Sequence, residues 1–213
     1  MIYLITGIIL AYLIGSISTA VWVGRVFYKI DIREHGSKNA GATNVLRILG
    51  AKAGIPVLLF DAFKGWLAVW LSQYFIADLI NPISIEGYRI GMGCAAVVGH
   101  IFPIFTGFKG GKGVATILGA SLALYPIPSL VTIALFIVIM LSSRIVSLAS
   151  VSCSVFFPLT VQIFSPTAPD WPLMILSIII AVFIPLTHQK NILRLLKGEE
   201  KKFTIGSSRK KPE

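Results

Sequence analysis

The chain contains one glycine-rich segment whose residue types suit the binding of a phosphate group. It joins two apolar runs and reads Gly107-Phe108-Lys109-Gly110-Gly111-Lys112-Gly113-Val114-Ala115-Thr116. Glycine allows positive φ and a close approach of the backbone, lysine supplies a positive charge, and a following helix offers unpaired N–H groups to an anion. The segment therefore predicts a phosphate-binding loop. The alternative is that the glycines form a tight turn between two helices while the lysines mark the cytoplasmic side of a membrane.

This segment does not match the nucleotide-binding loop of ATPases and GTPases. That loop has a glycine at the position of Thr106 and, after the lysine, a serine or threonine whose hydroxyl holds magnesium. This chain has Thr106 at the first of these positions and Gly113 at the second. We therefore expect no nucleoside triphosphate, no cofactor and no metal ion at this site.

A second polar segment, residues 31–50, is too rich in hydrogen-bonding groups to lie in lipid. The turn-forming glycines and neutral donors of this segment are Gly36, Ser37, Asn39, Gly41, Thr43 and Asn44. Arg47 can bind a phosphate through two parallel N–H groups. A solvated loop with helix caps explains the same residues equally well, because serine and asparagine favour caps for local reasons.

A third basic segment follows the last apolar run and is compatible with a short amphipathic helix. On a helix His188, Asn191 and Arg194 fall at positions i, i+3 and i+6, close to one face. The alternative is a helix that only rests on an anionic membrane surface. Three polar and basic segments predicted on one side of the membrane favour a shared site for an anionic ligand.

The elements that must position these segments are predicted to be membrane helices. The chain has 213 residues, of which 55% are hydrophobic and 13% charged, and its mean hydropathy is +0.84. This composition excludes an ordinary soluble domain, and it disfavours nucleic-acid binding despite the net charge of +10. We expect an all-α integral membrane protein. A single domain is predicted over residues 1–205, with a flexible polar tail over 206–213.

Apolar runs mark the expected membrane segments. They lie at residues 2–24, 54–77, 87–105, 113–142, 146–165 and 171–187. If 113–142 crosses twice, every basic connection lies on one side, as the positive-inside rule requires. This predicts about seven helical segments with the N-terminus outside, the C-terminus in the cytoplasm, and Asp78 and Asp170 on the outer side.

The run 113–142 leaves two threadings open. As one helix it would be about 45 Å long at ~1.5 Å per residue, with Pro126 and Pro128 near its middle. As two helices, each half would be shorter than the ~30 Å hydrocarbon core and could form a thin or re-entrant pair.

Some polar residues inside the apolar runs also need an explanation. Asp61 and Lys64 lie three positions apart, and an uncompensated charge near the bilayer centre costs ~2.5–3.5 kcal/mol. We expect them to pair with each other or to support the site. His100 is interpreted as a helix-end hydrogen-bonding residue, and Cys94 and Cys153 as packing residues without a disulfide or a metal.

Together the three polar segments resemble the bacterial acyl-phosphate:glycerol-3-phosphate acyltransferase family, commonly called PlsY. The matching pieces are Gly36 to Asn44, Gly99-His100 with Pro103 and Gly107 to Thr116, and His188 to Asn191 with Arg194 and Gly198. Their order and spacing cover most of the chain. Ser147 and Ser150 resemble a further family patch, although small residues that let helices pack closely explain them as well.

The resemblance implies transfer of an acyl chain from acyl phosphate to the 1-hydroxyl of glycerol 3-phosphate, giving lysophosphatidic acid and inorganic phosphate. It implies a monomer surrounded by lipids in the bacterial plasma (inner) membrane, with a cytoplasmic active site, no cofactor and no nucleic acid. The catalytic residues would be Ser37, Arg47, Lys112, His188 and Asn191. The substrate-binding residues would be Gly36, Asn39, Thr43, Asn44, Lys109, Gly110, Gly111, Ser150 and Arg194. A transporter of an organic phosphate is the alternative function.

His188 has two possible roles in that reaction. Its ordinary pKa near 6.5 suits a general base, but a histidine that only orients the substrate hydroxyl fits as well. A phosphate oxygen of the substrate would then take the proton.

Overall fold

A computed structural model describes residues 2–76, 82–164 and 171–204, and within these ranges the chain forms helices and no strands. The predicted all-α class is thus confirmed. The α-helices are α1 (Ile2–Gly15), α2 (Thr19–Tyr28), α3 (Ala42–Leu49), α4 (Ala51–Leu71), α5 (Pro82–Ile101), α6 (Val114–Leu124), α7 (Pro126–Ser143), α8 (Val146–Phe164), α9 (Trp171–Thr187) and α10 (Gln189–Leu196). Three short 3-10 helices are η1 (Ile32–Glu34), η2 (Ser72–Tyr74) and η3 (Ile104–Thr106). Asp78, Asp170 and the tail 206–213 lie outside the described residues.

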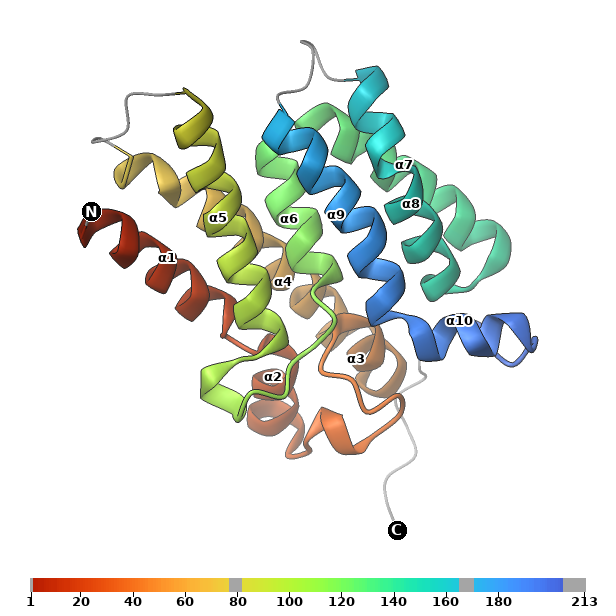
Figure 1. Ribbon diagram of the computed structural model, residues 1–213. Coiled ribbons are helices and arrows are strands. Elements are labelled where there is room, and N and C mark those ends of the chain that lie inside the picture. Colours follow the sequence, from red (N-terminus) through yellow and green to blue (C-terminus); the bar gives the residue numbers. More distant parts are fainter. Residues whose placement is uncertain (1, 77–81, 165–170, 205–213) are drawn as a thin grey trace.

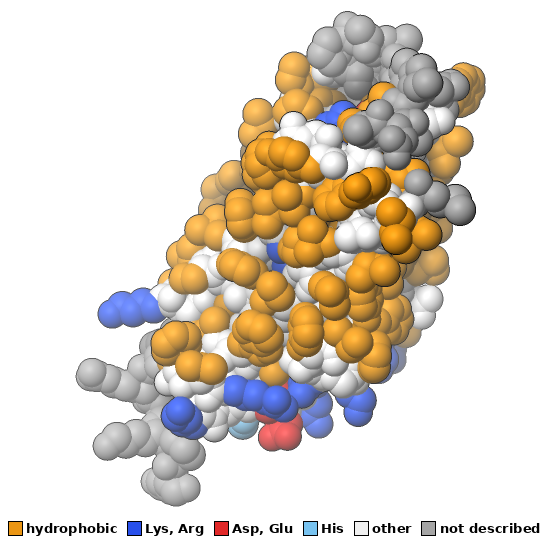
Figure 2. All heavy atoms as spheres, turned by 90° about the vertical axis from the view of Figure 1, so that its left-hand side faces the viewer, with side chains coloured by type: hydrophobic (Ala, Val, Ile, Leu, Met, Phe, Trp, Pro, Cys, Tyr) orange, Lys and Arg blue, Asp and Glu red, His pale blue; other side chains and the backbone are white. Residues whose placement is uncertain are grey.

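The long helices form a bundle whose polar connections gather at one end, where α2, α3 and α10 also lie (Figure 1). Hydrophobic side chains cover most of one face of the bundle, and Lys and Arg side chains collect near that same end (Figure 2). Among the described residues four helices are long and apolar enough to cross a membrane, or up to six spans if two bent helix pairs each count as one. An apolar belt with a charged end is the arrangement expected of a multi-pass membrane protein.

The first apolar run, expected as one segment over 2–24, is divided into α1 and α2 with a bend of 41°. Tertiary contacts explain the division. A side chain at Gly15 would lie 2.0 Å from the carbonyl oxygen of Ala96, so α1 touches α5 backbone to backbone. At the break, the carbonyl of Ile17 accepts hydrogen bonds from the ammonium group of Lys64 at 2.8 Å and from the amide of Thr19 at 3.1 Å. The break therefore depends on residues far away in the sequence.

The long run 113–142 is divided into two helices, as the two-helix threading requires. The division falls at Tyr125, with Pro126 in the first turn of α7, where its missing N–H costs nothing. The two parts are unequal: α6 has 11 residues and α7 has 18. At ~1.5 Å per residue α6 is only about 16 Å long, so it is a short helix rather than a full span.

The short helix α6 is held against α4 by a close contact between their backbones. A side chain at Gly119 would lie 1.7 Å from the carbonyl oxygen of Ala62, and one at Gly65 would lie 2.1 Å from that of Thr116. Only glycine permits such an approach, which is a common way of packing helices in membranes. Because α6 begins directly after the glycine-rich loop, this contact fixes where the loop ends.

Candidate active site

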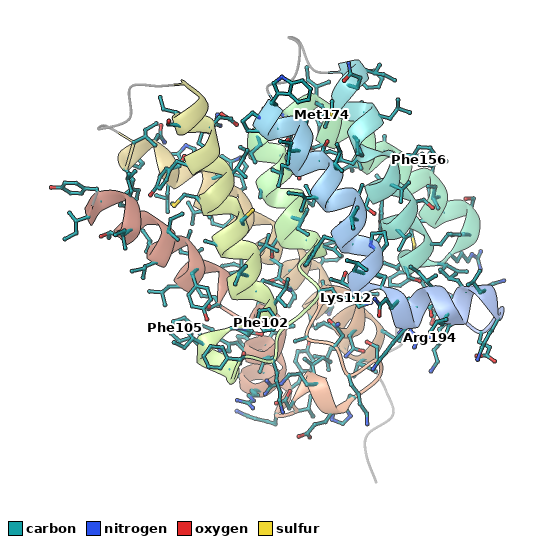
Figure 3. All side chains as sticks on the ribbon, in the orientation of Figure 1. Phe102, Phe105, Lys112, Phe156, Met174 and Arg194 are labelled. Atoms are coloured by element: carbon teal, nitrogen blue, oxygen red, sulfur yellow. The ribbon has the colours of Figure 1, made fainter. Side chains whose placement is uncertain are left out.

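Residues from two distant segments meet at the polar end of the bundle. Lys112 lies beside the junction of α9 and α10, and Arg194 extends from α10 (Figure 3). The ammonium group of Lys112 donates a hydrogen bond of 2.5 Å to the side-chain oxygen of Asn191. The glycine-rich loop and the third basic segment, separated by about 80 positions, are thus joined through two side chains that the sequence predicts to act together.

An acidic side chain completes this cluster. One carboxylate oxygen of Glu200 accepts hydrogen bonds from the amide of Asn191 at 2.7 Å and from the hydroxyl of Ser147 at 2.9 Å. The other oxygen accepts from Nε of Arg194 at 2.6 Å. We call Lys112, Ser147, Asn191, Arg194 and Glu200 the polar cluster.

The chain after α10 folds back to bring Glu200 into place. Gly198 adopts a left-handed conformation with φ of 70°, and the amide of Phe203 donates to the carbonyl of Arg144 at 2.5 Å. The carboxylate consequently lies at the N-terminal end of α8, where the helix dipole favours negative charge. Glu200 is not among the site residues predicted from the sequence. The available signal was an acidic pair in a segment otherwise dominated by lysine and arginine.

The electrostatics of the cluster lower the pKa values of two of its groups. The pKa of Lys112 is lowered to about 8, chiefly by burial; the charge of Glu200 opposes this shift and that of Arg194 adds to it. Burial would raise the pKa of Glu200, but the hydrogen bonds from Arg194, Asn191 and Ser147 outweigh it and hold that pKa below its usual value. Near neutral pH the cluster thus holds a charged lysine next to a charged carboxylate.

His188 is buried at the end of α9, with 5% of its surface exposed. Its Nδ1 lies 2.9 Å from the carbonyl oxygen of Ile184 and donates to it, which leaves Nε2 without a proton in the neutral ring. Burial lowers the pKa of His188 to about 4, and the neighbouring charge of Lys112 acts in the same direction. The ring is therefore neutral at physiological pH, and its Nε2 can accept a hydrogen bond from a hydroxyl group.

The glycine-rich loop offers fewer free N–H groups than its sequence indicates. The amides of Gly110 and Gly111 donate to the carbonyls of Ile101 and His100 at 3.0 and 3.2 Å. These two residues therefore hold the loop against the end of α5 in this conformation. Within the described part of the chain, free N–H groups remain in the first turn of α6, which follows Gly113 with its φ of 81°, and in the backbone of Lys112 and Gly113 just before it. An anion at that helix end would also be close to Lys112.

The second polar segment is built around Asn44, which is 2% exposed. Its side-chain nitrogen donates to the carbonyls of Ile32, His35 and Asn39 at 3.0 to 3.1 Å, and its oxygen accepts from the amide of Ser37 at 2.9 Å. Because every polar atom of this side chain is used within the segment, Asn44 shapes the loop rather than facing outward.

The other predicted site residues are not joined to the polar cluster by hydrogen bonds. Ser37 and Lys109 are exposed, whereas Gly36, the half-buried Asn39 and Thr43, and Arg47 belong to the loop and helix around Asn44. Among the described residues the side chain of Arg47 forms neither a hydrogen bond nor an ion pair. Ser150 is buried one turn beyond Ser147 on α8 and also lacks a hydrogen-bonding partner there. The structure thus brings together Lys112, Asn191 and Arg194, beside His188, and places Ser37 and Arg47 on the neighbouring loop.

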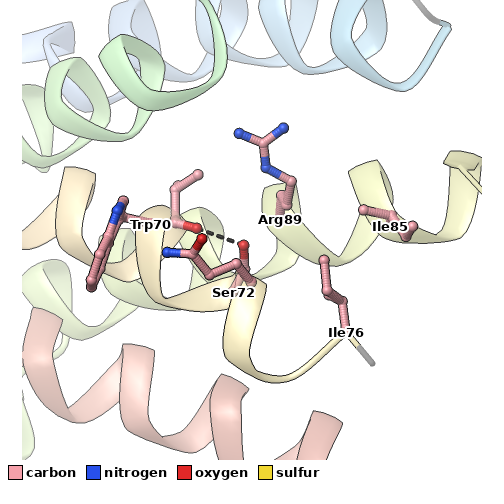
Figure 4. A pocket seen from close by; sticks show the side chains of 7 residues that line it. Trp70, Ser72, Ile76, Ile85 and Arg89 are labelled. Carbon is pink, nitrogen blue, oxygen red and sulfur yellow. Dashed lines mark hydrogen bonds between the residues drawn. The ribbon is translucent and has the colours of Figure 1, made fainter. Parts of the chain in front are cut away.

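A pocket of about 290 Å³ lies away from this site. It lies where the C-terminal end of α4 meets the N-terminal half of α5, at the ends of these helices that are far from the polar cluster (Figure 4). Its lining residues are Val69, Trp70, Ser72, Gln73, Ile76, Ile85 and Arg89. Arg89 is already paired with Glu86 at 3.0 Å, so this pocket lacks a free cation for an anionic substrate. In the part of the chain that the structure covers, no three His, Cys, Asp or Glu side chains are grouped to hold a metal ion.

The chain is similar to known proteins over nearly its whole length. The model of the glycerol-3-phosphate acyltransferase family matches residues 5–198. Proteins called glycerol-3-phosphate acyltransferase from Fusobacterium nucleatum and Enterococcus faecalis are 43% and 40% identical over 92% and 96% of this chain, and over 96% and 94% of their own length. The crystal structure of PlsY (YgiH) in its glycerol 3-phosphate form superposes with a TM-score of 0.83 at 35% identity, covering 94% of this chain and 96% of that one. The lysophosphatidic acid form gives a TM-score of 0.80 at 34% identity, covering 95% of this chain and 96% of that one.

Proposed function

Because the chain belongs to the glycerol-3-phosphate acyltransferase family, we propose that it transfers an acyl chain from acyl phosphate to the 1-hydroxyl of glycerol 3-phosphate. The observation that carries the proposal is the convergence of Lys112, His188 and Asn191 at one end of an apolar bundle. A cation, a neutral hydrogen-bond acceptor and an amide next to an unpaired helix end suit a phosphate ester with a hydroxyl group.

The crystal structures of a relative support both the acceptor substrate and the product of this reaction. One is described as a glycerol 3-phosphate form and the other as a lysophosphatidic acid form, which are the acceptor substrate and the product of the proposed transfer. The acyl donor carries a hydrocarbon chain that can lie among lipids, while glycerol 3-phosphate arrives from water. A site at the boundary between the apolar belt and the charged end can reach both.

In the proposed reaction the 1-hydroxyl oxygen forms a bond to the acyl carbon, and the bond between that carbon and the phosphate oxygen breaks. The phosphate leaves with the electron pair of the broken bond and receives the hydroxyl proton. Since phosphate is already a good leaving group, catalysis consists mainly of positioning and charge neutralisation. Lys112 supplies positive charge to a phosphate, and the first turn of α6 supplies N–H donors.

His188 is proposed to orient the attacking hydroxyl through Nε2. Its low pKa makes it a weak base, so a phosphate oxygen of the substrate is the better proton acceptor. Asn191 and Glu200 hold Lys112 and Arg194 in place, while Ser37 and Arg47 bind the acceptor substrate from the neighbouring loop. Asn44, whose polar atoms are all used within its loop, supports these residues instead of binding substrate.

The membrane arrangement that accompanies this function is a monomer in the bacterial plasma membrane, with its polar end in the cytoplasm. If α1 with α2 forms one span and α6 enters only part of the bilayer, then α4, α5, α7, α8 and α9 complete the predicted seven segments, and α10 lies at the cytoplasmic end. The basic residues of α10 and of the tail support this assignment, because positive charge is retained on the cytoplasmic side.

The test is formation of lysophosphatidic acid by the purified protein from labelled glycerol 3-phosphate. Acyl phosphate, acyl-CoA and acylated acyl carrier protein are supplied in parallel reactions. Product from acyl phosphate alone supports the proposal. Product only from a thioester donor would overturn the donor, and no product from any donor would favour the transporter alternative, which the comparisons do not favour.

A further inference from the structure

Arg33, in the short helix η1, reaches the glycine-rich loop although it belongs to neither that loop nor the polar cluster. Its Nη1 donates to the carbonyl oxygens of Thr106 at 2.8 Å and of Lys109 at 3.2 Å. These two carbonyls lie on either side of Gly107 and Phe108. One guanidinium therefore bridges the turn through which the chain enters the loop.

The guanidinium is itself held rigidly by Asp31. The carboxylate of Asp31 accepts from Nε of Arg33 at 3.0 Å and from Nη2 at 2.8 Å, and it also accepts from the Arg33 backbone amide at 3.0 Å. This paired arrangement holds the pKa of Asp31 well below its usual range, chiefly through the side-chain bonds from Arg33. With Nε and Nη2 engaged, Nη1 is aimed at the loop carbonyls.

The turn that Arg33 bridges needs outside support. Gly107 and Phe108 both have positive φ, 72° and 59°, and for Phe108 this left-handed conformation is unfavourable. Such a conformation persists only where surrounding contacts enforce it. Within the turn, the amide of Phe108 donates to the carbonyl of Pro103 at 2.8 Å, and beyond it the amides of Gly110 and Gly111 are held by the end of α5. Arg33 adds the tie that connects the carbonyls of this turn to the second polar segment.

We propose that Arg33 is a positioning residue of the transferase, fixing the 106–109 turn so that Lys112 and the first turn of α6 meet the substrate phosphate. The inference rests on the proposed function. Arg33 does not touch substrate in this account; it acts through the loop. A lysine could not replace it, because one ammonium group cannot bond to both oxygens of Asp31 and to two carbonyls with the same geometry.

Arg25 offers a matched control on the same carboxylate. Its Nη2 donates to Asp31 at 2.8 Å, but 56% of its side chain is exposed and it makes no hydrogen bond to the glycine-rich loop. Arg33→Gln and Arg25→Gln each remove one positive charge and one partner of Asp31. They differ in the contact with the loop.

The experiment measures KM for glycerol 3-phosphate and for acyl phosphate, kcat, and thermal unfolding of the detergent-solubilised protein for both variants and for Arg33→Lys. The contact between the loop and a substrate phosphate forms when the substrate binds and persists in the transition state. A misplaced loop therefore raises KM more than it lowers kcat. We expect Arg33→Gln to raise KM for a phosphate substrate about tenfold, as loss of a charge-assisted hydrogen bond implies. Arg33→Lys should recover only part of the loss, and Arg25→Gln should stay within about twofold of the wild type.

The KM that rises identifies which substrate phosphate the loop holds, and a rise for either one supports the inference. Unchanged KM values for both substrates in Arg33→Gln would overturn it, as would equal shifts in Arg25→Gln or a loss confined to the unfolding temperature. Calorimetric binding of glycerol 3-phosphate and of acyl phosphate separates this inference from the proposed reaction. If the wild type binds without turnover, the reaction fails. Weaker binding of either substrate by Arg33→Gln, and not by Arg25→Gln, still supports the role of Arg33, whereas equal binding of both removes it. If the wild type neither binds nor reacts, both fail together.

Discussion

Asp61 and Lys64 form an ion pair of 2.7 Å in the interior of α4, and each side chain is only 1% exposed. The pair is also connected to the break between α1 and α2, because Thr19 donates to Asp61 at 3.2 Å and Lys64 donates to the carbonyl of Ile17. On the other side, Nδ1 of His100 lies 3.6 Å from the carboxylate of Asp61. The sequence analysis left open whether these charges pair or support the site, and the structure shows that they pair.

Removing one member of this pair should destabilise the protein. Asp61→Asn or Lys64→Met leaves the other charge buried without its partner, a change that costs about 3–5 kcal/mol in protein interiors. We expect a lower unfolding temperature for each single variant in detergent. The double variant Asp61→Asn/Lys64→Met removes both charges and should recover part of the loss. Equal unfolding temperatures for the singles and the wild type would contradict this account.

Lys112→Ala should remove most transferase activity while the protein stays folded. The loss of a positive charge aimed at a phosphate in a partly desolvated site is expected to lower kcat/KM about a hundredfold or more. Lys197→Ala, at the exposed end of α10, removes the same charge outside the site and serves as the control. Near-normal turnover of Lys112→Ala with a normal unfolding temperature would refute the assignment of Lys112.

The activity should fall as the pH rises through about 8. Burial lowers the pKa of Lys112 to about 8, so the ammonium group is charged below this pH and neutral above it. A phosphate monoester has its second pKa near ~6, so substrate ionisation does not change in this range. The pH profile of kcat/KM reports groups of the free enzyme. In Lys112→Arg, whose side chain stays charged, the decline should move to higher pH; an unmoved decline would assign it to another group.

Glu200→Gln should reduce both stability and kcat/KM at neutral pH. An amide cannot form the ion pair with Arg194, and it places an N–H group where Ser147 and Asn191 now donate. Because the pKa of Glu200 in the folded protein lies below its ordinary value of 4.5, the stabilisation is present above pH 4.5 and is lost as the pH falls through the lowered value. Unfolding measured from pH 7 down to pH 4 should show the difference between wild type and variant becoming smaller. A difference independent of pH would indicate that the charge is not responsible.

Chelation of divalent ions should leave the reaction rate largely unchanged. The glycine-rich loop has Gly113 where a magnesium-binding loop has serine or threonine. The assay is repeated after treatment with EDTA and again after addition of magnesium. Loss of turnover that magnesium restores would contradict the expectation.

Patterns along the chain were enough to predict the membrane helices and the segments that carry the site. Long apolar runs mark the residues that lie in the hydrocarbon core as helices. The boundaries of α8 and α9 consequently agree with the predicted runs to within one residue. Two prolines near the middle of 113–142 allowed a division to be predicted, because proline removes a helical hydrogen bond and its ring crowds the preceding turn. Proline alone does not decide the matter, since Pro56, Pro158 and Pro185 lie inside α4, α8 and α9. Anion binding was indicated by the glycines and lysines of the loop and by the spacing of His188, Asn191 and Arg194. Backbone freedom, side-chain charge and position on a helix face follow from residue type and spacing, so they can be read without the fold.

Contacts between distant residues decided the rest. The break after Gly15 depends on Ala96 and Lys64, and the carboxylate of Glu200 meets the hydroxyl of Ser147 because the chain folds back after Gly198. Whether an N–H of Gly110 faces a substrate or a carbonyl of α5 is likewise settled by packing. Local composition determines what a residue can do, whereas the partner that it finds depends on which other parts of the chain the fold brings to the same place.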